Sequence, residues 1–274
     1  MRLVPLLAVM LAGCAAPARV SVSGGPNLGG IVSTNPCADA MLVELAPERL
    51  TAISQYSHDP AATSLPLDVA RRFRVTAGTA EEVIALRPAL VVTSSFTPLA
   101  TRTAYDRAGL KTLLLDSPAT VAASEAQIAL VADAVGQPRR GAAMIARIED
   151  ALERAKQRDS APAPSALLFI GGTLANGPGN LLDELLTHAG FRNATRDYGL
   201  PYTSTVALET IAADPPALIL TPGPSRPAML RSKVLARMHA PTRFATFART
   251  LINCGGPTIA PAITRLAQLR RGQS

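Results

Sequence analysis

EEVIALRPALVVT, residues 81–93, and ETIAADPPALILT, residues 209–221, are two copies of one sequence pattern set 128 positions apart. In each copy a short helix with an acidic start ends before a proline, Pro88 or Pro216, because the residue preceding a proline is disfavoured in the helical conformation. The apolar run that follows has the length and β-branched content of a buried parallel strand. The chain is therefore predicted to contain two similar units, each the helix-to-strand half of a βαβ unit.

The flanking pattern extends these units into two α/β lobes. A helix from 138 to about 158 is expected between them; at 1.5 Å per residue it is about 30 Å long and could span both lobes. We expect an N-terminal lobe over 30–135, a connecting helix over 138–159 and a C-terminal lobe over 165–274. Strands are predicted at 29–33, 50–54, 111–115, 166–170 and 250–252, and further helices at 38–45, 98–108, 122–135, 181–189, 229–238 and from 257 onward.

Composition excludes disorder and argues against a nucleic-acid surface. The 274 residues are 48% hydrophobic, enough for two cores of ordinary domain size. The net charge is +7, but 24 of the 27 basic residues are arginines scattered singly or in pairs, and there is no tryptophan. We interpret the charge as general arginine usage and predict no nucleic-acid partner.

The N-terminus resembles a bacterial lipoprotein signal. Arg2 precedes the apolar run 3–11, which is too short to span a bilayer, and the run ends on LAGC at 11–14. The resemblance implies a signal peptide over 1–13, lipidation of Cys14 and a tether over 14–29, with the remaining chain in the periplasm. A plain secretory signal is the alternative, and the sequence leaves open whether the inner or the outer membrane holds the anchor.

Polar loops after the predicted strands are the candidate binding sites, because ligands of open α/β sheets lie outside the carboxyl ends of the strands. The loop at 55–60 is the most polar. Its adjacent Ser57, His58 and Asp59 cannot form a catalytic triad, and no Gly-x-Ser-x-Gly turn occurs. The loop at 176–180 lacks the Lys-Ser/Thr of a phosphate-binding loop. We predict a binding protein and not an enzyme, with an exported α/β hydrolase as the weaker alternative.

The order of elements resembles the substrate-binding proteins of ABC importers for cobalamin, ferric siderophores and haem. The similarity rests on the repeated unit, the loop at 56–59, the lone helix between lobes and the turn at 253–256, and it covers the chain from about residue 30. It implies a ligand cleft between two α/β lobes with central sheets. The ligand-binding residues expected from these loops are Asn35, Tyr56, Ser57, His58, Ser95, Gly172, Asn176, Asn253 and Gly255. The lack of tryptophan departs from the usual cobalamin binders.

The same resemblance implies a permease and its ATPase as partners. Glu81 and Glu209 match the acidic residues, one in each lobe, that dock on the permease, and Glu82 could substitute for Glu81. We expect a monomer without a cofactor of its own that captures a corrinoid, a ferric siderophore or a haem-type ligand. A free transition-metal receptor is the alternative, although three histidines supply few ligands unless carboxylates contribute.

Two cysteines remain once Cys14 is lipidated. Cys37 and Cys254 follow predicted strands of different lobes, and export places them in an oxidising compartment where an even pair usually bonds. We predict a disulfide that ties the lobes together. Two alternatives stay open: both thiolates ligate the metal of a captured ligand, or the two cysteines are an isolated buried pair.

Overall fold

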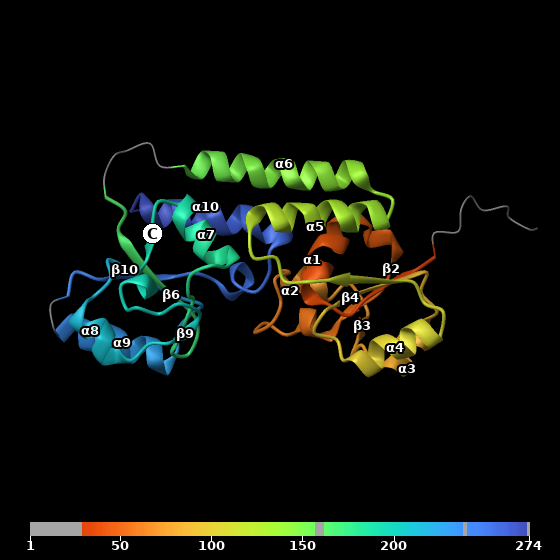
Figure 1. Ribbon diagram of the computed structural model, residues 1–274, viewed down its shortest axis with the longest axis horizontal. Coiled ribbons are helices and arrows are strands. Elements are labelled where there is room, and N and C mark those ends of the chain that lie inside the picture. Colours follow the sequence, from red (N-terminus) through yellow and green to blue (C-terminus); the bar gives the residue numbers. More distant parts are fainter. Residues whose placement is uncertain (1–28, 157–161, 238–239, 273–274) are drawn as a thin grey trace, which may run out of the picture.

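The computed structural model describes residues 29–156, 162–237 and 240–272. The expected signal peptide, the lipidated Cys14, most of the tether and the end of the connecting helix at 157–159 lie outside these ranges. The described chain forms two α/β lobes side by side, with α6 (Pro138–Ala155) lying across both (Figure 1). Among these residues no helix is both long enough and apolar enough to cross a bilayer.

The N-terminal lobe is built on a five-stranded parallel sheet in the order β3-β2-β1-β4-β5. Its helices α1 and α5 cover one face, and α3 and α4 cover the other (Figure 1). Buried apolar strands with helices on both faces are the expected outcome of right-handed βαβ crossovers. The elements are β1 (Ile31–Ser33), α1 (Pro36–Leu45), β2 (Leu50–Ser54), α2 (Leu67–Ala70), β3 (Val75–Thr76), α3 (Ala80–Leu86), β4 (Leu90–Ser94), α4 (Leu99–Arg107), β5 (Thr112–Leu115) and α5 (Val121–Ala134).

The C-terminal lobe repeats this plan around a six-stranded sheet in the order β11-β10-β6-β7-β9, with β8 also paired to β6. Strands β11, β10, β6 and β8 are parallel, whereas β7 pairs antiparallel with both β6 and β9. The elements are β6 (Ser165–Gly171), β7 (Leu174–Ala175), α7 (Leu181–His188), β8 (Arg192–Asn193), β9 (Ser204–Thr205), α8 (Leu208–Ala213), β10 (Leu218–Thr221), α9 (Arg226–Arg237), β11 (Arg243–Thr246) and α10 (Ile259–Arg270).

The repeated sequence unit is confirmed as one structural unit in each lobe: α3 with β4, and α8 with β10. The first apolar residue of each strand pairs with the leading strand of its lobe, Leu90 with Ile31 and Leu218 with Ala166. Both copies therefore place a buried strand beside the first strand of the lobe. The helices α3 and α8 lie on the side of the molecule opposite α6 (Figure 1).

The predicted strand at 250–252 is wrong. The edge strand of the second sheet is β11 (Arg243–Thr246), and residues 249–251 form a 3-10 turn. Three of the four β11 residues are exposed, because an edge strand has one free side and needs no continuous apolar run. Helix α1 also begins at Pro36, two residues earlier than predicted, because the Asn35 side chain caps it and proline suits the first helical position.

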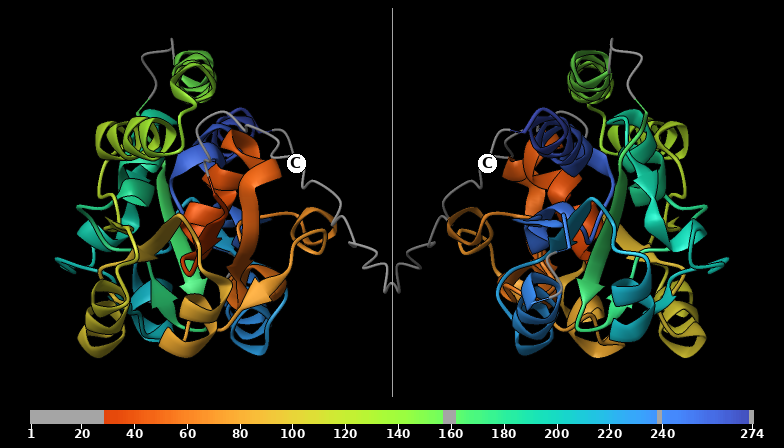
Figure 2. Two further views of the ribbon diagram at one scale, coloured as in Figure 1. Left: turned by 90° about the vertical axis from the view of Figure 1, so that its right-hand side faces the viewer. Right: turned by 90° about the vertical axis from the view of Figure 1, so that its left-hand side faces the viewer.

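The two lobes share one core. A single cluster of buried apolar side chains runs from β1 and α1 through α5, α6 and β6 to α10. Helix α6 is the outermost layer when the molecule is seen along its long axis (Figure 2). It approaches α5 closely at Gly141, where a Cβ would lie 2.4 Å from the Cβ of Ala132. The connecting helix is therefore packed against both lobes and forms part of their shared core.

Candidate functional site: the cleft between the lobes

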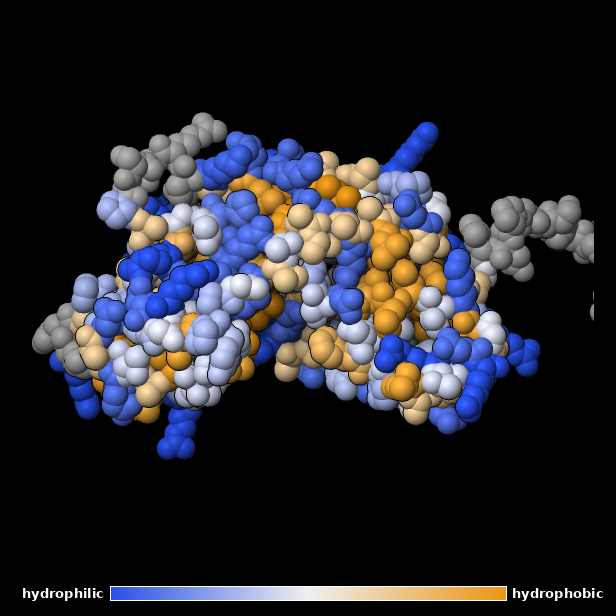
Figure 3. Space-filling view, in the orientation of Figure 1, coloured by the Kyte–Doolittle hydropathy of each residue, from blue (hydrophilic) through white to orange (hydrophobic). Residues whose placement is uncertain are grey.

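A cleft of about 660 Å³ lies between the lobes. In the N-terminal lobe it lies at the carboxyl ends of the parallel strands, and in the C-terminal lobe it lies against the loops that follow β7 and precede α10. The outline of the molecule is indented there, on the side opposite α6 (Figure 3). This volume falls in the range of small-molecule sites. The N-terminal lobe contributes residues 34–37, Met41, Tyr56, residues 77–78, 94, 96–98 and 115–118, and Gln127. The C-terminal lobe contributes Asn176 and residues 180–182 and 252–256.

Two capped helix starts line the cleft from opposite lobes. The Asn35 side chain accepts a hydrogen bond from the backbone N–H of Cys37 at the start of α1. In the same way the Asn180 side chain accepts from the N–H of Asp183 at the start of α7. Capping asparagines satisfy backbone donors that a helix start leaves unpaired. Each lobe thus presents an asparagine-capped helix start to the cleft.

Five of the nine predicted ligand-binding residues line this cleft, and four do not. Asn35, Tyr56, Asn176, Asn253 and Gly255 line it. Ser57 is fully buried, and the His58 ring bonds the Ala70 carbonyl at 3.0 Å. The two others outside the cleft are Ser95 and Gly172.

Two aromatic rings in the cleft wall are unusually exposed. Tyr56 is 52% exposed and Phe96 is 80% exposed. Apolar rings left in water at a cleft are available to pack against a ligand. Phe96 was not among the predicted ligand-binding residues, although it is the neighbour of the predicted Ser95. Its place in the loop after the strand of the first repeated unit was the available signal.

The lining carries almost no charge. Its polar side chains are amides and hydroxyls, including Gln127 and Asn176, and among the described residues Asp116 is the only charged one that lines it. Among the described residues no three His, Cys, Asp or Glu side chains gather into a metal site. The walls therefore favour apolar surface and neutral hydrogen-bonding groups.

A buried carboxyl group holds the Tyr56 loop in place. Asp39, in the first turn of α1, is completely buried and accepts hydrogen bonds from the Ser57 hydroxyl at 2.6 Å and the Ser54 N–H at 2.9 Å. The Ser33 hydroxyl beside it donates to the Asn35 carbonyl, and no described group donates to Asp39 Oδ1. Burial raises the pKa of Asp39 to about 7, and the hydrogen bonds oppose that rise.

Asp39→Asn is expected to remove a pH dependence of stability. The folded pKa lies above the ordinary value of 3.8, so the folded protein holds the proton more tightly. The free energy of unfolding should therefore fall by about 2 to 4 kcal/mol as the pH rises from 4 to 7. Urea unfolding across this range measures it, with the wild type sloping downward relative to the variant. Parallel curves for the two proteins would mean that Asp39 does not titrate there.

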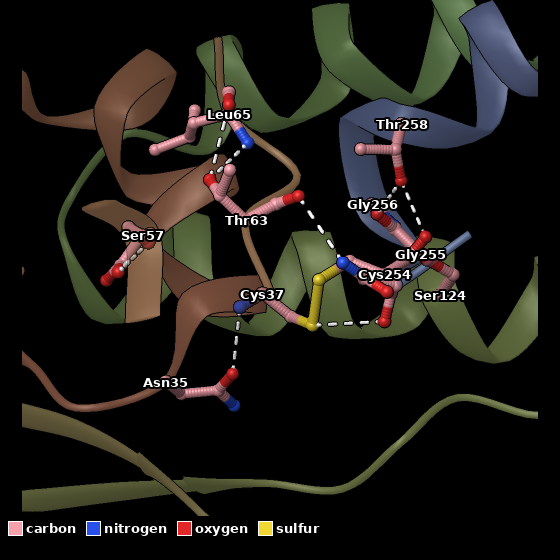
Figure 4. Close-up of a disulfide and its surroundings, with 12 residues drawn as sticks. Asn35, Cys37, Ser57, Thr63, Leu65, Ser124, Cys254, Gly255, Gly256 and Thr258 are labelled. Carbon is pink, nitrogen blue, oxygen red and sulfur yellow. Dashed lines mark hydrogen bonds between the residues drawn. A yellow bond between two sulfur atoms is a disulfide. The ribbon is translucent and has the colours of Figure 1, made fainter. Parts of the chain in front are cut away.

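The floor of the cleft is a C-terminal segment that crosses to the N-terminal lobe (Figure 4). The structure joins Cys37 to Cys254 by a disulfide whose Cα atoms are 5.3 Å apart. The Asn253 side-chain amide donates to the Thr63 carbonyl at 3.4 Å, and the Gly256 N–H donates to the Ser124 hydroxyl at 2.7 Å. A Cβ on Gly255 would lie 2.8 Å from that hydroxyl oxygen, so a larger residue here would force the neighbouring side chains to shift.

The three acidic residues expected to dock on a permease lie outside the cleft. Glu81 is exposed in the first turn of α3, and Glu209 is exposed in the first turn of α8. Glu82 instead accepts hydrogen bonds from the Thr76 hydroxyl and the Ala77 N–H, which lower its pKa. Its carboxylate is already used to hold the turn before α3, so Glu81 is the freer of the two.

Two α/β lobes packed on one long helix, with a cleft between them, define a two-lobed solute-binding protein. The chain belongs to the periplasmic binding protein family, whose sequence model matches residues 31–242. The resemblance to the substrate-binding proteins of ABC importers is thereby confirmed. A search of curated protein sequences gave no match.

Solved structures share this fold. The chain is similar to the periplasmic haem-binding protein RhuT from Roseiflexus sp. RS-1, with 22% identity, a TM-score of 0.72 and coverage of 89% of this chain and 98% of that one. The periplasmic haem-binding protein HutB of Vibrio cholerae is 15% identical, with a TM-score of 0.72 and coverage of 88% and 98%. The vitamin B12-binding protein BtuF of Vibrio cholerae is 17% identical, with a TM-score of 0.66 and coverage of 89% and 96%.

Proposed function

We propose that the protein is the lipid-anchored substrate-binding component of an ABC import system. It captures a corrinoid, a ferric siderophore or a haem-type ligand in the inter-lobe cleft and delivers it to a permease. The observation that carries this proposal is the cleft itself, which is large, faced by Tyr56 and Phe96, and lined by neutral amides. Such walls suit a bulky ligand with apolar faces and hydrogen-bonding edges. The ligands named for RhuT, HutB and BtuF are of this kind.

Absorbance and native mass spectrometry of protein purified from its own periplasm test this function. Corrinoids, haem and many ferric siderophores are coloured, so a co-purified ligand identifies itself. Titration of ligand-free protein with haem, cobalamin, a ferric siderophore and free transition-metal ions separates the chelate from the free-metal alternative. Binding of bare metal ions but of none of the chelates would favour the free-metal receptor. Hydrolysis of ester substrates, with no binding of these chelates or metal ions, would favour the hydrolase.

Tyr56→Ala is expected to weaken ligand binding by about 1 to 3 kcal/mol, because the substitution removes an aromatic surface from the cleft wall. Tyr202→Ala is the matched control: Tyr202 is 67% exposed but does not line the cleft. Calorimetric titration of both variants with the identified ligand measures the difference. Equal ligand affinity of the wild type and the Tyr56→Ala variant would mean that Tyr56 has only a structural role.

The lipid anchor is expected from the LAGC segment at 11–14 and lies outside the described residues. Cys14→Ser should move the protein from the membrane fraction to the soluble fraction, because acyl chains can no longer be attached. Fractionation followed by mass spectrometry of the mature N-terminus tests this. A mature N-terminus at residue 18 or later, without acyl mass, would rule out the anchor.

A further inference from the structure

A second, smaller pocket of about 160 Å³ lies in the C-terminal lobe, where β6 and β10 end. Phe169 and Gly172 line it from β6 and the turn after it, and Ser225 lines it just before α9. The rest of its wall comes from residues 221–224, from Arg231 of α9 and from Arg249 of the 3-10 turn after β11, and none of the described residues that line it is acidic. The pocket therefore concentrates two positive charges at the carboxyl ends of parallel strands, where α/β sheets usually bind ligands.

Arg231 is an unusual residue for a protein interior. It is only 4% exposed, and its guanidinium carbon lies 3.6 Å from the centre of the Phe169 ring. One terminal nitrogen donates to the Gly172 carbonyl at 3.1 Å, but Nε has no hydrogen-bond partner among the described residues. Burial lowers the pKa of this arginine from its ordinary value, although an arginine stays charged in proteins.

The charge of this pocket is not balanced within the described chain. Neither Arg231 nor Arg249 forms an ion pair there, and Arg249 donates to the Ile170 carbonyl at 2.8 Å. A buried cation without a counter-charge is costly, and an unpaired buried donor adds to that cost. The planar guanidinium of an arginine matches the two oxygens of a carboxylate or a phosphate.

We propose that the pocket formed by Phe169, Gly172, Ser225, Arg231 and Arg249 binds an anionic oxygen group, a carboxylate or a phosphate. The group can belong to a free anion or to the ligand held in the cleft. The second source rests on the proposed function. The connection to the cleft is short in sequence, because Asn176, four residues after Gly172, lines the main cleft wall.

Calorimetry and thermal unfolding with acetate and inorganic phosphate test the site on the ligand-free protein, with ionic strength held constant by sodium chloride. We expect saturable binding that raises the unfolding midpoint. Arg231→Met keeps an apolar side chain against Phe169 and should weaken anion binding about tenfold to hundredfold. Arg237→Met is the matched control, because Arg237 is an exposed arginine of the same helix.

A wild-type protein that neither anion stabilises more than chloride does, and that binds haem and haem dimethyl ester equally, would overturn the site. So would unchanged anion binding in a folded Arg231→Met variant. Arg231 would then have only a structural role on Phe169.

A second experiment distinguishes a free anion from an anionic group on the ligand held in the cleft. Haem and its dimethyl ester share the same metalloporphyrin, but the ester carries two neutral methyl ester groups in place of the two charged side-chain carboxylates. Tighter binding of haem than of the ester, lost in Arg231→Met, assigns the pocket to a carboxylate on the ligand. Equal binding of both compounds beside normal acetate or phosphate binding assigns it to a free anion. If no haem, corrinoid or siderophore binds while these anions do, the proposed function fails and the anion site stands.

Discussion

Reversing Glu81 and Glu209 together to arginine is expected to abolish ligand uptake while leaving ligand affinity unchanged. Both carboxylates are exposed at the same position of the repeated unit, in the first turns of α3 and α8. The two helices lie on one side of the molecule, opposite α6 (Figure 1). Two equivalent points on one side suit a permease with two similar halves, as the family resemblance implies. Each reversal converts an attractive contact into a repulsive one, worth about 2 to 5 kcal/mol at a docked interface.

Uptake in cells that carry the matching permease, measured together with calorimetric ligand affinity of the purified protein, tests this docking. The control reverses Glu149 and Asp150 on α6, which places the same charge change on the opposite side of the molecule. Glu82→Gln is a second control. It disturbs the turn before α3, so it should lower stability with little loss of uptake per folded molecule. A double Glu81/Glu209 variant that loses ligand binding would place these residues in the cleft and contradict docking.

The fold could be predicted because its main signals are local in sequence. Buried parallel strands leave short apolar runs, and the repeated unit supplied the same strand twice, as β4 and β10. Strand β11 carries no such run, because Arg243 and Phe244 are exposed on an edge. The β-branched and apolar residues at 250–252 were the stronger but false signal. Edge strands are defined by their neighbour across the sheet, which a single sequence does not reveal.

Part of the site was predictable from the rule that ligands of open α/β sheets lie outside the carboxyl ends of the strands. That rule placed Asn35 and Tyr56 on loops that the fold brings to the cleft. Asn253 also lines the cleft, although the strand predicted before it is a 3-10 turn. The rule could not tell which neighbours in a loop face inward, and so Ser57 was chosen although it turns into the core to bond Asp39. Orientation within a loop depends on contacts with distant segments, and these are fixed only in three dimensions.

The burial of Arg231 could not be predicted from amino-acid composition. As one of 24 arginines it looked like surface charge, yet it lies one helical turn before Leu235 on the buried face of α9. That i, i+4 spacing with an apolar residue was the available signal. Asp39 gave a similar signal, because it lies between the apolar residues Ala38 and Ala40 of α1.

Loss of the Cys37–Cys254 disulfide is expected to lower the free energy of unfolding by about 3 to 5 kcal/mol. The cross-link joins residues 217 positions apart, and closing so long a loop in the unfolded chain removes a large conformational entropy. It also ties α1 to the segment that forms the cleft floor, whose other links are the hydrogen bonds of Asn253 and Gly256. In an oxidising compartment this bond would hold the lobes together at the base of the cleft.

Urea unfolding of the oxidised protein, the reduced protein and the Cys37→Ser/Cys254→Ser variant measures the effect, all in a Cys14→Ser background that leaves only these two cysteines. Reductant should lower the midpoint of the oxidised protein and leave the double variant unchanged. Thiol counting on the denatured, unreduced protein should give zero free thiols. Two free thiols would eliminate the disulfide; loss of the metal chelate on alkylating them would then favour thiolate ligation, and unchanged binding would leave an isolated buried pair.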